Sequence, residues 1–398
     1  MRNLGMAVGA LALAACGDNV SPPILAIYGE PTFVAYRATG AWIVPSGDQG
    51  ADGYWRYRLD EVADDYVAAF ACSSAVVPGQ VVVHQLDATI GDGDQTFDGL
   101  CVPPDLGAAT LDVTAYSAQS VDLTVGGTPM QLVETGATPE PYKYEAQVAP
   151  GPRDLIAVGG VDGENRSEIH RALDVVDGPI TDKQFDLSTD GAPLALDIIA
   201  FTGDHAGTAQ ARSSIWTTAN GFVGVSNGIV PSTDTAEPVA IPVPDPSQLE
   251  SADVLDLEVD LEFASVYVEV TASASPPTSI ELPPHISVAP NVGTDGTVTW
   301  TAPDGAAFDD ASFALYTTDN SVAQSLDVTS AYLAAHPDEP TAFDATAPGW
   351  NPAWNAYAQD FTLFMRLSSM TITSDYTLWL DNQYLSSQPQ LRDALTAP

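Results

Sequence analysis

Basic residues are scarce in this chain. Its 398 residues include 12 Lys plus Arg against 53 Asp plus Glu, which gives a formal net charge of −41. Lysine occurs only at Lys143 and Lys183. A surface of this sign repels the phosphates of nucleic acids and of anionic lipid headgroups. The composition therefore argues against DNA or RNA as a partner, and it favours solubility.

Long apolar runs are missing after the first fifteen residues. A helix that spans a bilayer needs about 20 predominantly apolar residues, and no stretch beyond Ala15 approaches that length. Hydrophobic residues nevertheless make up 45% of the chain, so buried cores can form and global disorder is not expected. The chain after Ala15 is therefore predicted to be soluble and folded.

Helical periodicity is also scarce, and an alternation with a period of two residues takes its place. Trp55, Tyr57 and Leu59 share one face of a segment whose other face carries Arg56 and Arg58. The same alternation recurs at 111–115, 121–125 and 266–270. Half-buried antiparallel strands show this pattern. Short helices are predicted only at 330–336, 350–357 and 390–396, so a parallel α/β sheet is not expected.

The predicted fold is all-β, with several antiparallel β-sandwich modules in tandem. Modules of roughly 80–110 residues would fit the immunoglobulin and fibronectin architecture. No tryptophan lies between Cys72 and Cys101, so this resemblance concerns architecture alone. After a signal peptide (1–15) and a tether (16–23), the predicted modules are 24–105, 106–203, 204–285 and 286–398. A proline-rich linker is predicted at 230–247.

The first residues form an export signal. Arg2 precedes a short apolar run, and the run ends in Leu13-Ala14-Ala15-Cys16. This motif resembles the lipobox of bacterial lipoproteins. The resemblance implies that Cys16 is diacylated, that the peptide is cut before it, and that the new amine is acylated. Several acyl chains hold a protein stably on a membrane. The expected location is the outer membrane, the cell surface or the periplasm, with the protein anchored by lipid.

Only three cysteines are present, and lipidation of Cys16 leaves Cys72 and Cys101. Outside the cytosol, two such thiols are expected to pair. A bridge closing a loop of this length stabilises the fold by roughly 3–4 kcal/mol on the chain-entropy model. The sequence therefore predicts a Cys72–Cys101 disulfide, with two reduced buried thiols as the alternative.

No catalytic motif is convincing. Gly224-Val225-Ser226-Asn227-Gly228 matches the G-x-S-x-G pattern of a nucleophile elbow, which needs a strand before the serine and a helix after it. Pro231 forbids a regular helix start there, so Asn227-Gly228 is better explained as a hairpin turn. The five histidines show no zinc-site spacing: His84, His170, His205, His285 and His336.

Two weak binding candidates remain. Asp92, Asp94 and Asp98 lie in a glycine-rich loop and could gather Ca²⁺, although the EF-hand pattern is not met and a solvated turn is the alternative. Trp350, Trp354 and Tyr357 stand at helical spacing. Exposed, these aromatic side chains could stack on sugars or anchor a partner. Buried, they would cap the last module, and this reading is favoured.

The sequence therefore predicts a lipid-anchored envelope protein with a non-enzymatic binding, adhesion or structural role toward a protein or glycan. The alternative is a secreted hydrolase acting on polysaccharide or ester. A calcium-stabilised stalk is a third hypothesis. No cofactor other than calcium is suggested. A concave pocket with convergent polar groups would favour catalysis, whereas a flat aromatic patch would favour adhesion.

Overall fold

The structure is a computed structural model, and it describes most of the chain. Described are residues 21–386 apart from 39, 51–52, 63, 103–108, 117–121, 126–127, 130, 136–141, 149–150, 162–163, 176–179, 188–189, 203–208, 218–221, 231–237 and 262–263. Strands account for 55% of the residues, and the α-helix found among the described residues is short. The all-β prediction is confirmed, whereas tandem immunoglobulin-like modules are not. No described helix is long and apolar enough to cross a membrane.

The chain divides into two compact units, and both are built from segments far apart in the sequence. Unit 1 comprises Met1–Pro104, Ile286–Ser369 and Asn382–Pro398, and unit 2 comprises Asp105–His285 and Met370–Asp381. The predicted first and last modules thus contribute to one compact unit.

In the part of unit 1 that the structure describes, eleven strands and four short helical segments belong to this unit alone. They are β1 (Ile24–Tyr28), β2 (Pro31–Arg37), β3 (Gly47–Gln49), β4 (Tyr54–Arg58), β5 (Asp65–Ser73), β6 (Val81–Thr89), η1 (Ile90–Asp92), β7 (Gln95–Phe97), β24 (Asn291–Val292), β25 (Val298–Thr299), β26 (Asp310–Thr317), β27 (Val322–Thr329), α1 (Ser330–Ala335), η3 (Pro352–Trp354) and η4 (Ala356–Ala358). Strands β28 (Phe361–Ile372) and β29 (Tyr376–Leu385) contribute to both units. Two of the three predicted helices are therefore present as short helical turns, while 390–396 lies outside the described residues.

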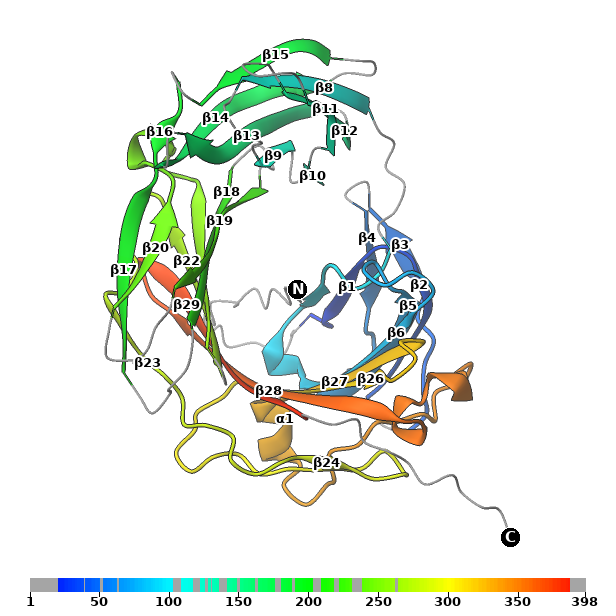
Figure 1. Cartoon of the computed structure of the whole chain (residues 1–398). Coiled ribbons are helices and arrows are strands. Elements are labelled where there is room, and N and C mark those ends of the chain that lie inside the picture. The colour runs from blue at the N-terminus through cyan, green and yellow to red at the C-terminus, as the bar shows by residue number, and fades with distance from the viewer. Residues whose placement is uncertain are drawn as a thin grey trace. The chain divides into compact units, whose positions relative to one another are not determined.

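The main sheet of unit 1 has the strand order β2-β5-β6-β27-β26-β28. Strand β6 pairs in parallel with β27, which comes from the other end of the chain (Figure 1). In this register Ser325 lies opposite His84. A second sheet, β3-β4-β1-β7, packs against one face of β2, β5 and β6. Leu25, Ile27 and Phe70 are fully buried between these layers. The second sheet covers only part of the main sheet, and this partial cover positions the site described below.

The opposite face of the main sheet carries the other core of unit 1. Phe313, Phe361 and Met365 are buried there, under the segments 286–302 and 341–357. Two buried glutamines hold the second of these segments in place. Gln85 donates to the Ala342 carbonyl and accepts from the Asp344 amide, and Gln324 accepts from the Ala356 amide. Buried polar side chains need such partners to offset the loss of water.

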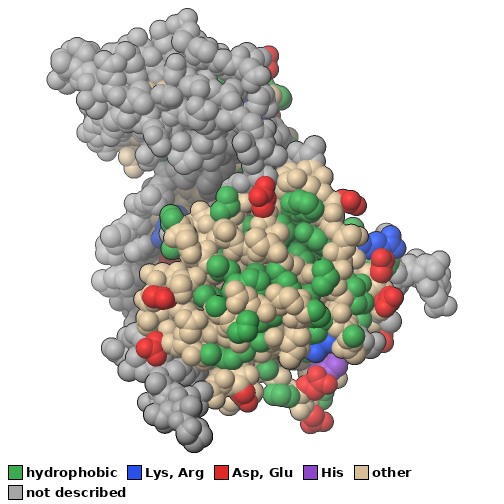
Figure 2. All heavy atoms as spheres, turned by 90° about the vertical axis from the view of Figure 1, so that its right-hand side faces the viewer, with side chains coloured by type: hydrophobic (Ala, Val, Ile, Leu, Met, Phe, Trp, Pro, Cys, Tyr) green, Lys and Arg blue, Asp and Glu red, His purple; other side chains and the backbone are tan. Residues whose placement is uncertain are grey.

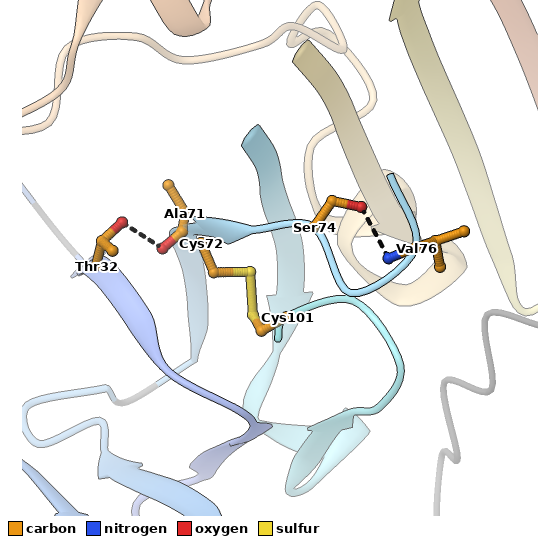
Figure 3. The surroundings of a disulfide bond; sticks show 6 residues. All are labelled: Thr32, Ala71, Cys72, Ser74, Val76 and Cys101. Atoms are coloured by element: carbon orange, nitrogen blue, oxygen red, sulfur yellow. Dashed lines mark hydrogen bonds between the residues drawn. A yellow bond between two sulfur atoms is a disulfide. The ribbon is translucent and has the colours of Figure 1, made fainter. Parts of the chain in front are cut away.

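The predicted disulfide between Cys72 and Cys101 is present, with its Cα atoms 5.5 Å apart. It joins the end of β5 to the segment after β7, where Ser74 and Cys101 also form an isolated β-bridge (Figure 3). Gly29 has φ +109° and lies against this bridge; a Cβ there would come within 2.7 Å of the Cys101 Cβ. Glycine is therefore required at this close approach.

Among its described residues, unit 2 contains seventeen elements of its own. They are β8 (Ala109–Tyr116), β9 (Asp122–Val125), β10 (Thr128–Pro129), β11 (Gln131–Thr135), β12 (Tyr142–Val148), β13 (Gly151–Val161), β14 (Glu164–Val175), β15 (Ile180–Asp186), β16 (Ala192–Pro193), β17 (Ala195–Thr202), β18 (Ala209–Trp216), β19 (Phe222–Val230), β20 (Val239–Val243), η2 (Pro246–Gln248), β21 (Val254–Asp260), β22 (Ala264–Thr271) and β23 (Ser279–Glu281). The alternating segments 111–115 and 266–270 fall in β8 and β22, as predicted, and the described part of 121–125 forms β9. Part of the expected linker at 230–247 is instead strand β20, which pairs with β17.

Candidate functional site

A cavity of about 90 Å³ lies in unit 1, where the second sheet stops short of β27, β26 and β28. We call it the groove. Four segments meet there: β6, the end of β7 with the residues after it, the pair β26–β27, and β28. The groove is lined by His84, Phe97, Asp98, Leu100, Ser312, Ala314, Tyr316, Ser325, Asp327, Phe364 and Arg366.

Strand register explains why polar side chains gather on one side of the main sheet. Along β27, Ser325 and Asp327 are two residues apart and therefore point to the same face. Ser312 of β26 lies opposite Asp327 on one side and opposite Arg366 of β28 on the other. An aspartate, a serine and an arginine thus form one row across three strands. Ser325 and His84 lie opposite each other in the row beside it.

His84 is the most constrained of these side chains. Its side chain is only 6% exposed, and its ring lies between Phe70 and Phe97 with centroid separations of 5.2 and 4.4 Å. Burial lowers the pKa of His84, against the opposing effect of the Asp327 carboxylate. The imidazole is therefore neutral near pH 7 and can accept a proton.

The two ring nitrogens of His84 face different groups. Nδ1 lies 2.7 Å from Ser325 Oγ, within hydrogen-bond distance. Nε2 lies 3.4 Å from Asp327 Oδ2, which is an ion-pair separation, but Nε2 is buried and has no hydrogen-bond partner. The carboxylate favours the tautomer with hydrogen on Nε2, because an N–H beside a negative charge is electrostatically preferred. Nδ1 then accepts the hydroxyl hydrogen of Ser325.

Asp98 and Tyr316 complete the polar lining. Asp98 accepts a hydrogen bond of 2.6 Å from the Tyr54 hydroxyl, and burial raises the pKa of its carboxyl despite that bond. Burial also raises the pKa of Tyr316, so its phenol stays protonated and can donate. The Arg366 guanidinium, which lies 3.4 Å from Ser312 Oγ, supplies the positive charge. The groove thus presents hydrogen-bond donors and acceptors, and side chains of both positive and negative charge.

The disulfide borders this site. Asp98 and Leu100 line the groove, and Cys101 directly follows Leu100. The backbone on both sides of the cystine is fixed by hydrogen bonds, including one from the Ala75 amide to the Leu100 carbonyl and one from the Val102 amide to the Ser73 carbonyl. The bridge, drawn in Figure 3, therefore ties the segment that carries Leu100 to the end of β5.

The three carboxylates proposed for calcium are held by different partners. Asp92 accepts from the amide and hydroxyl of Thr89 and from the hydroxyl of Thr329. Asp94 accepts from the Ile24 amide, and Asp98 from Tyr54. Within the described ranges, no group of three or more His, Cys, Asp or Glu side chains could hold a metal ion. These aspartates connect separate elements of unit 1 and do not converge on a point.

The aromatic candidates lie against the core. Tyr357 is buried, whereas Trp350 and Trp354 are half-buried and meet Phe33 of β2 with centroid separations of 6.0 and 5.5 Å. The Trp350 indole donates to Asn355. These rings cap the core under the main sheet, the arrangement that was favoured from the sequence.

Figure 2 shows a face of unit 1 with hydrophobic and uncharged side chains over its middle and acidic side chains around its rim.

The elbow motif is not an elbow. Strand β19 continues through Ser226, which lies opposite Ser213 of β18, although the register of the two strands shifts between Gly224 and Ser226. The predicted turn at Asn227-Gly228 is wrong for the same reason, since both residues continue the strand. A catalytic elbow needs a sharp turn that exposes the serine, and cross-strand pairing replaces it here. Cys16 lies outside the described residues.

Sequence reasoning missed the groove. In the segment 322–328, Ser325 and Asp327 alternate with the buried Leu326 and Val328, and polar residues in such an alternation are ordinarily expected to face water. No protein-family model matches the chain, and no curated protein matches it either. The geometry of the groove is therefore the basis on which a function can be argued.

Proposed function

We propose that this protein binds a small, neutral, polar molecule in the groove of unit 1 while tethered to the cell envelope. The observation that carries the proposal is the convergence of His84, Ser325, Asp327 and Arg366 on one cavity. Ligand sites characteristically combine a concave shape, apolar walls and a few oriented polar groups. Phe97 and Phe364 supply apolar wall, and the polar side chains supply orientation.

The lining defines the chemistry of the ligand. Arg366, Tyr316 and the Nε2–H of His84 are donors that suit a carbonyl oxygen. Asp327 and Asp98 are acceptors that suit a hydroxyl group. A bound anion would meet both carboxylates and the large negative charge of the chain, so a neutral ligand is favoured. A small hydroxy ester or hydroxy amide matches these requirements and the size of the cavity.

The buried Nε2 atom adds an energetic argument. A buried polar group without a hydrogen bond costs about 1–3 kcal/mol, and Nε2 of His84 is in that position beside the cavity. Apolar packing alone would be served better by phenylalanine between Phe70 and Phe97. A ligand atom that accepts from Nε2 would remove the cost when the site is filled.

The tether rests on the lipobox-like sequence at Cys16. A triacylated cysteine would hold the protein at the membrane through more than one chain, which is sufficient for stable anchoring. Mass spectrometry of the mature N-terminus is expected to find the acylated cysteine, and Cys16→Ser is expected to move the protein out of the membrane fraction. An unmodified Cys16 thiol in the mature protein would refute the tether.

Ligand binding is tested by saturation-transfer NMR with three probes: methyl lactate, lactate and glycerol. Methyl lactate, a neutral hydroxy ester, is expected to show transfer, and the lactate anion is expected to show less. Arg366→Met is expected to abolish the methyl lactate signal. Arg58→Met removes the same charge from an exposed site, where Arg58 pairs with Asp60, and is expected to leave the signal unchanged.

Two outcomes would contradict the proposed function. One is no transfer from any of the three probes to the wild-type protein. The other is an equal methyl lactate signal in wild type and in Arg366→Met, since binding would then lie elsewhere on the surface.

A further inference from the structure

We propose that the groove is also a hydrolytic site in which Ser325 is the nucleophile, His84 the base and Asp327 the group that orients the base. The inference rests on the proposed function for the class of ligand. It adds a chemical step that binding alone does not require. The substrate class is small neutral esters.

The contacts match the roles that ester hydrolysis needs. A serine hydroxyl is a weak nucleophile until a base within hydrogen-bond reach takes its proton. Ser325 Oγ lies 2.7 Å from His84 Nδ1, and the other nitrogen of the same ring lies 3.4 Å from Asp327 Oδ2. The order of the two nitrogens is the reverse of that in serine proteases, but such constellations are defined by geometry and roles.

Each partner has the exposure that its role requires. Ser325 is half-buried and lines the cavity, so its oxygen can reach a bound carbonyl carbon. His84 is buried and fixed by the rings of Phe70 and Phe97. The Asp327 side chain is 24% exposed, and its Oδ2 lies 3.4 Å from His84 Nε2, where it can orient the ring. Burial lowers the pKa of His84 and keeps the base unprotonated before reaction.

The step is balanced as follows. Ser325 Oγ bonds to the ester carbonyl carbon while its proton moves to His84 Nδ1, and negative charge develops on the carbonyl oxygen. Arg366 and Tyr316 line the cavity and supply the donors that this charge needs. The bond to the leaving oxygen then breaks, and the alcohol departs with the proton from His84. Water cleaves the acyl-serine with the help of His84, giving a carboxylic acid and free Ser325.

The charge of the site favours turnover. The substrate is neutral, whereas the product carboxylate would share the groove with Asp327 and Asp98. Like charges in a partly desolvated site repel each other. The acid is therefore expected to leave more readily than the ester, so the same two carboxylates select the substrate and release the product.

Covalent capture tests this inference on the full chain. A fluorophosphonate probe reacts with serines activated by a base, and peptide mass spectrometry locates the adduct. The adduct is expected on Ser325. His84→Asn keeps a polar side chain but removes the base and is expected to lower the labelling rate at least about a hundredfold, as general-base catalysis contributes about 10²–10⁴-fold. Asp327→Asn is expected to lower it about tenfold or more.

The matched control is His336→Asn. His336 also pairs with carboxylates, Asp65 at 3.1 Å and Glu339 at 3.2 Å, but it lies outside the groove lining. Its replacement is expected to leave labelling unchanged. The Asp327 side chain is more exposed than that of His84, at 24% against 6%, so Asp327→Asn keeps the test informative if His84→Asn does not fold.

An unlabelled Ser325, or labelling at equal rates in wild type and both groove variants, would overturn the inference. Binding of methyl lactate without labelling of Ser325 would overturn the hydrolytic step and leave the proposed function standing. Labelling of Ser325 without detectable methyl lactate binding would overturn the proposed function and leave the activated serine standing. The two cases can be told apart because the two measurements use different readouts.

Discussion

Buried charge is handled differently in the two units. In unit 2, Arg171 of β14 donates to Asp253 at 2.5 and 3.0 Å and to Asp154 at 3.2 Å, and both carboxylates are almost completely buried. Arg171 Nη2, which donates to Asp253, also donates to the Gln248 carbonyl. These groups satisfy one another and join β13, β14 and the segment before β21. Their arrangement is that of a structural cluster.

In unit 1 the comparable groups face a cavity. His84 is as buried as those aspartates, yet Nε2 has no hydrogen-bond partner, and its nearest charged neighbour, Asp327, also lines the groove. The comparison shows that burial and charge alone do not mark a functional site. What distinguishes the groove is that its polar side chains converge on a cavity and that a buried nitrogen of His84 has no hydrogen-bond partner there.

The largest effect is expected when the Arg171 cluster in unit 2 is broken. Arg171→Met would leave Asp154 and Asp253 buried without their cation, which typically costs about 3–5 kcal/mol. Hydrogen exchange is expected to show lost protection in peptides of β13, β14 and β21. Arg212→Met is the control, because the Arg212 side chain is 37% exposed and its ion pairs are longer; it should cost less than about 1 kcal/mol. Equal losses in the two variants would show that the cluster is not structural.

The next effect concerns the disulfide of unit 1. Cys72→Ser with Cys101→Ser removes a cross-link between residues 29 apart, which is expected to lower the free energy of unfolding by roughly 3–4 kcal/mol. Hydrogen exchange should increase in β5, β7 and the wall of the groove, while unit 2 keeps its protection. Cys16→Ser serves as the control and should leave exchange unchanged. A uniform loss across both units would contradict the local role.

A smaller, pH-dependent effect is expected at Asp87 of β6, on the opposite face from the groove. Burial raises the pKa of Asp87 from 3.8 to about 7, against the hydrogen bond from Gln85 and the charge of Arg37, while Asp344 and Glu339 act in the same direction as burial. The folded state therefore holds a proton that the unfolded state has lost between about pH 4 and pH 7. The contribution of Asp87 to the free energy of unfolding is therefore most favourable below pH 4, and it falls as the pH rises from 4 to 7.

Asp87→Asn removes that dependence. The pKa difference sets a ceiling near 4 kcal/mol, and because an amide is still polar we expect a gain of roughly 2 kcal/mol at pH 8 and none at pH 4. Chemical denaturation at both pH values measures it. Asp319→Asn, in an exposed turn, is the control and should not stabilise the protein at pH 8. A gain that is equal at both pH values would refute the assignment.

The smallest effect on stability is expected when His84 is replaced by phenylalanine. Phenylalanine can occupy the same place between Phe70 and Phe97, and it removes the buried nitrogen that lacks a partner. His84→Phe is therefore expected to raise the free energy of unfolding by about 1 kcal/mol while it abolishes labelling of Ser325. Thermal unfolding measures the first effect. Destabilisation by more than about 2 kcal/mol would mean that His84 serves the fold in the same way as Arg171.

Much of the local structure was predictable. The alternation at 54–59 and 266–270 predicted β4 and β22, and Ser330 to His336 predicted helix α1, because period and proline placement are local properties. The bridge between Cys72 and Cys101 followed from the cysteine count. The wrong prediction of a turn at Asn227-Gly228 arose because this segment is held in β19 by pairing with β18, which is not a local property.

The sequence alone determined the strand content, the cystine, the strong negative charge and the lipobox-like start at Cys16, since composition and short-range pattern are sufficient for each. Only the tertiary structure decided which strands pair and which polar faces are enclosed. Ser325 and His84 are 241 residues apart in the chain, and they meet because β6 and β27 pair in parallel. A polar residue on a strand looks the same in the sequence whether it faces water or a cavity, so the groove could be found only after the sheets were assembled.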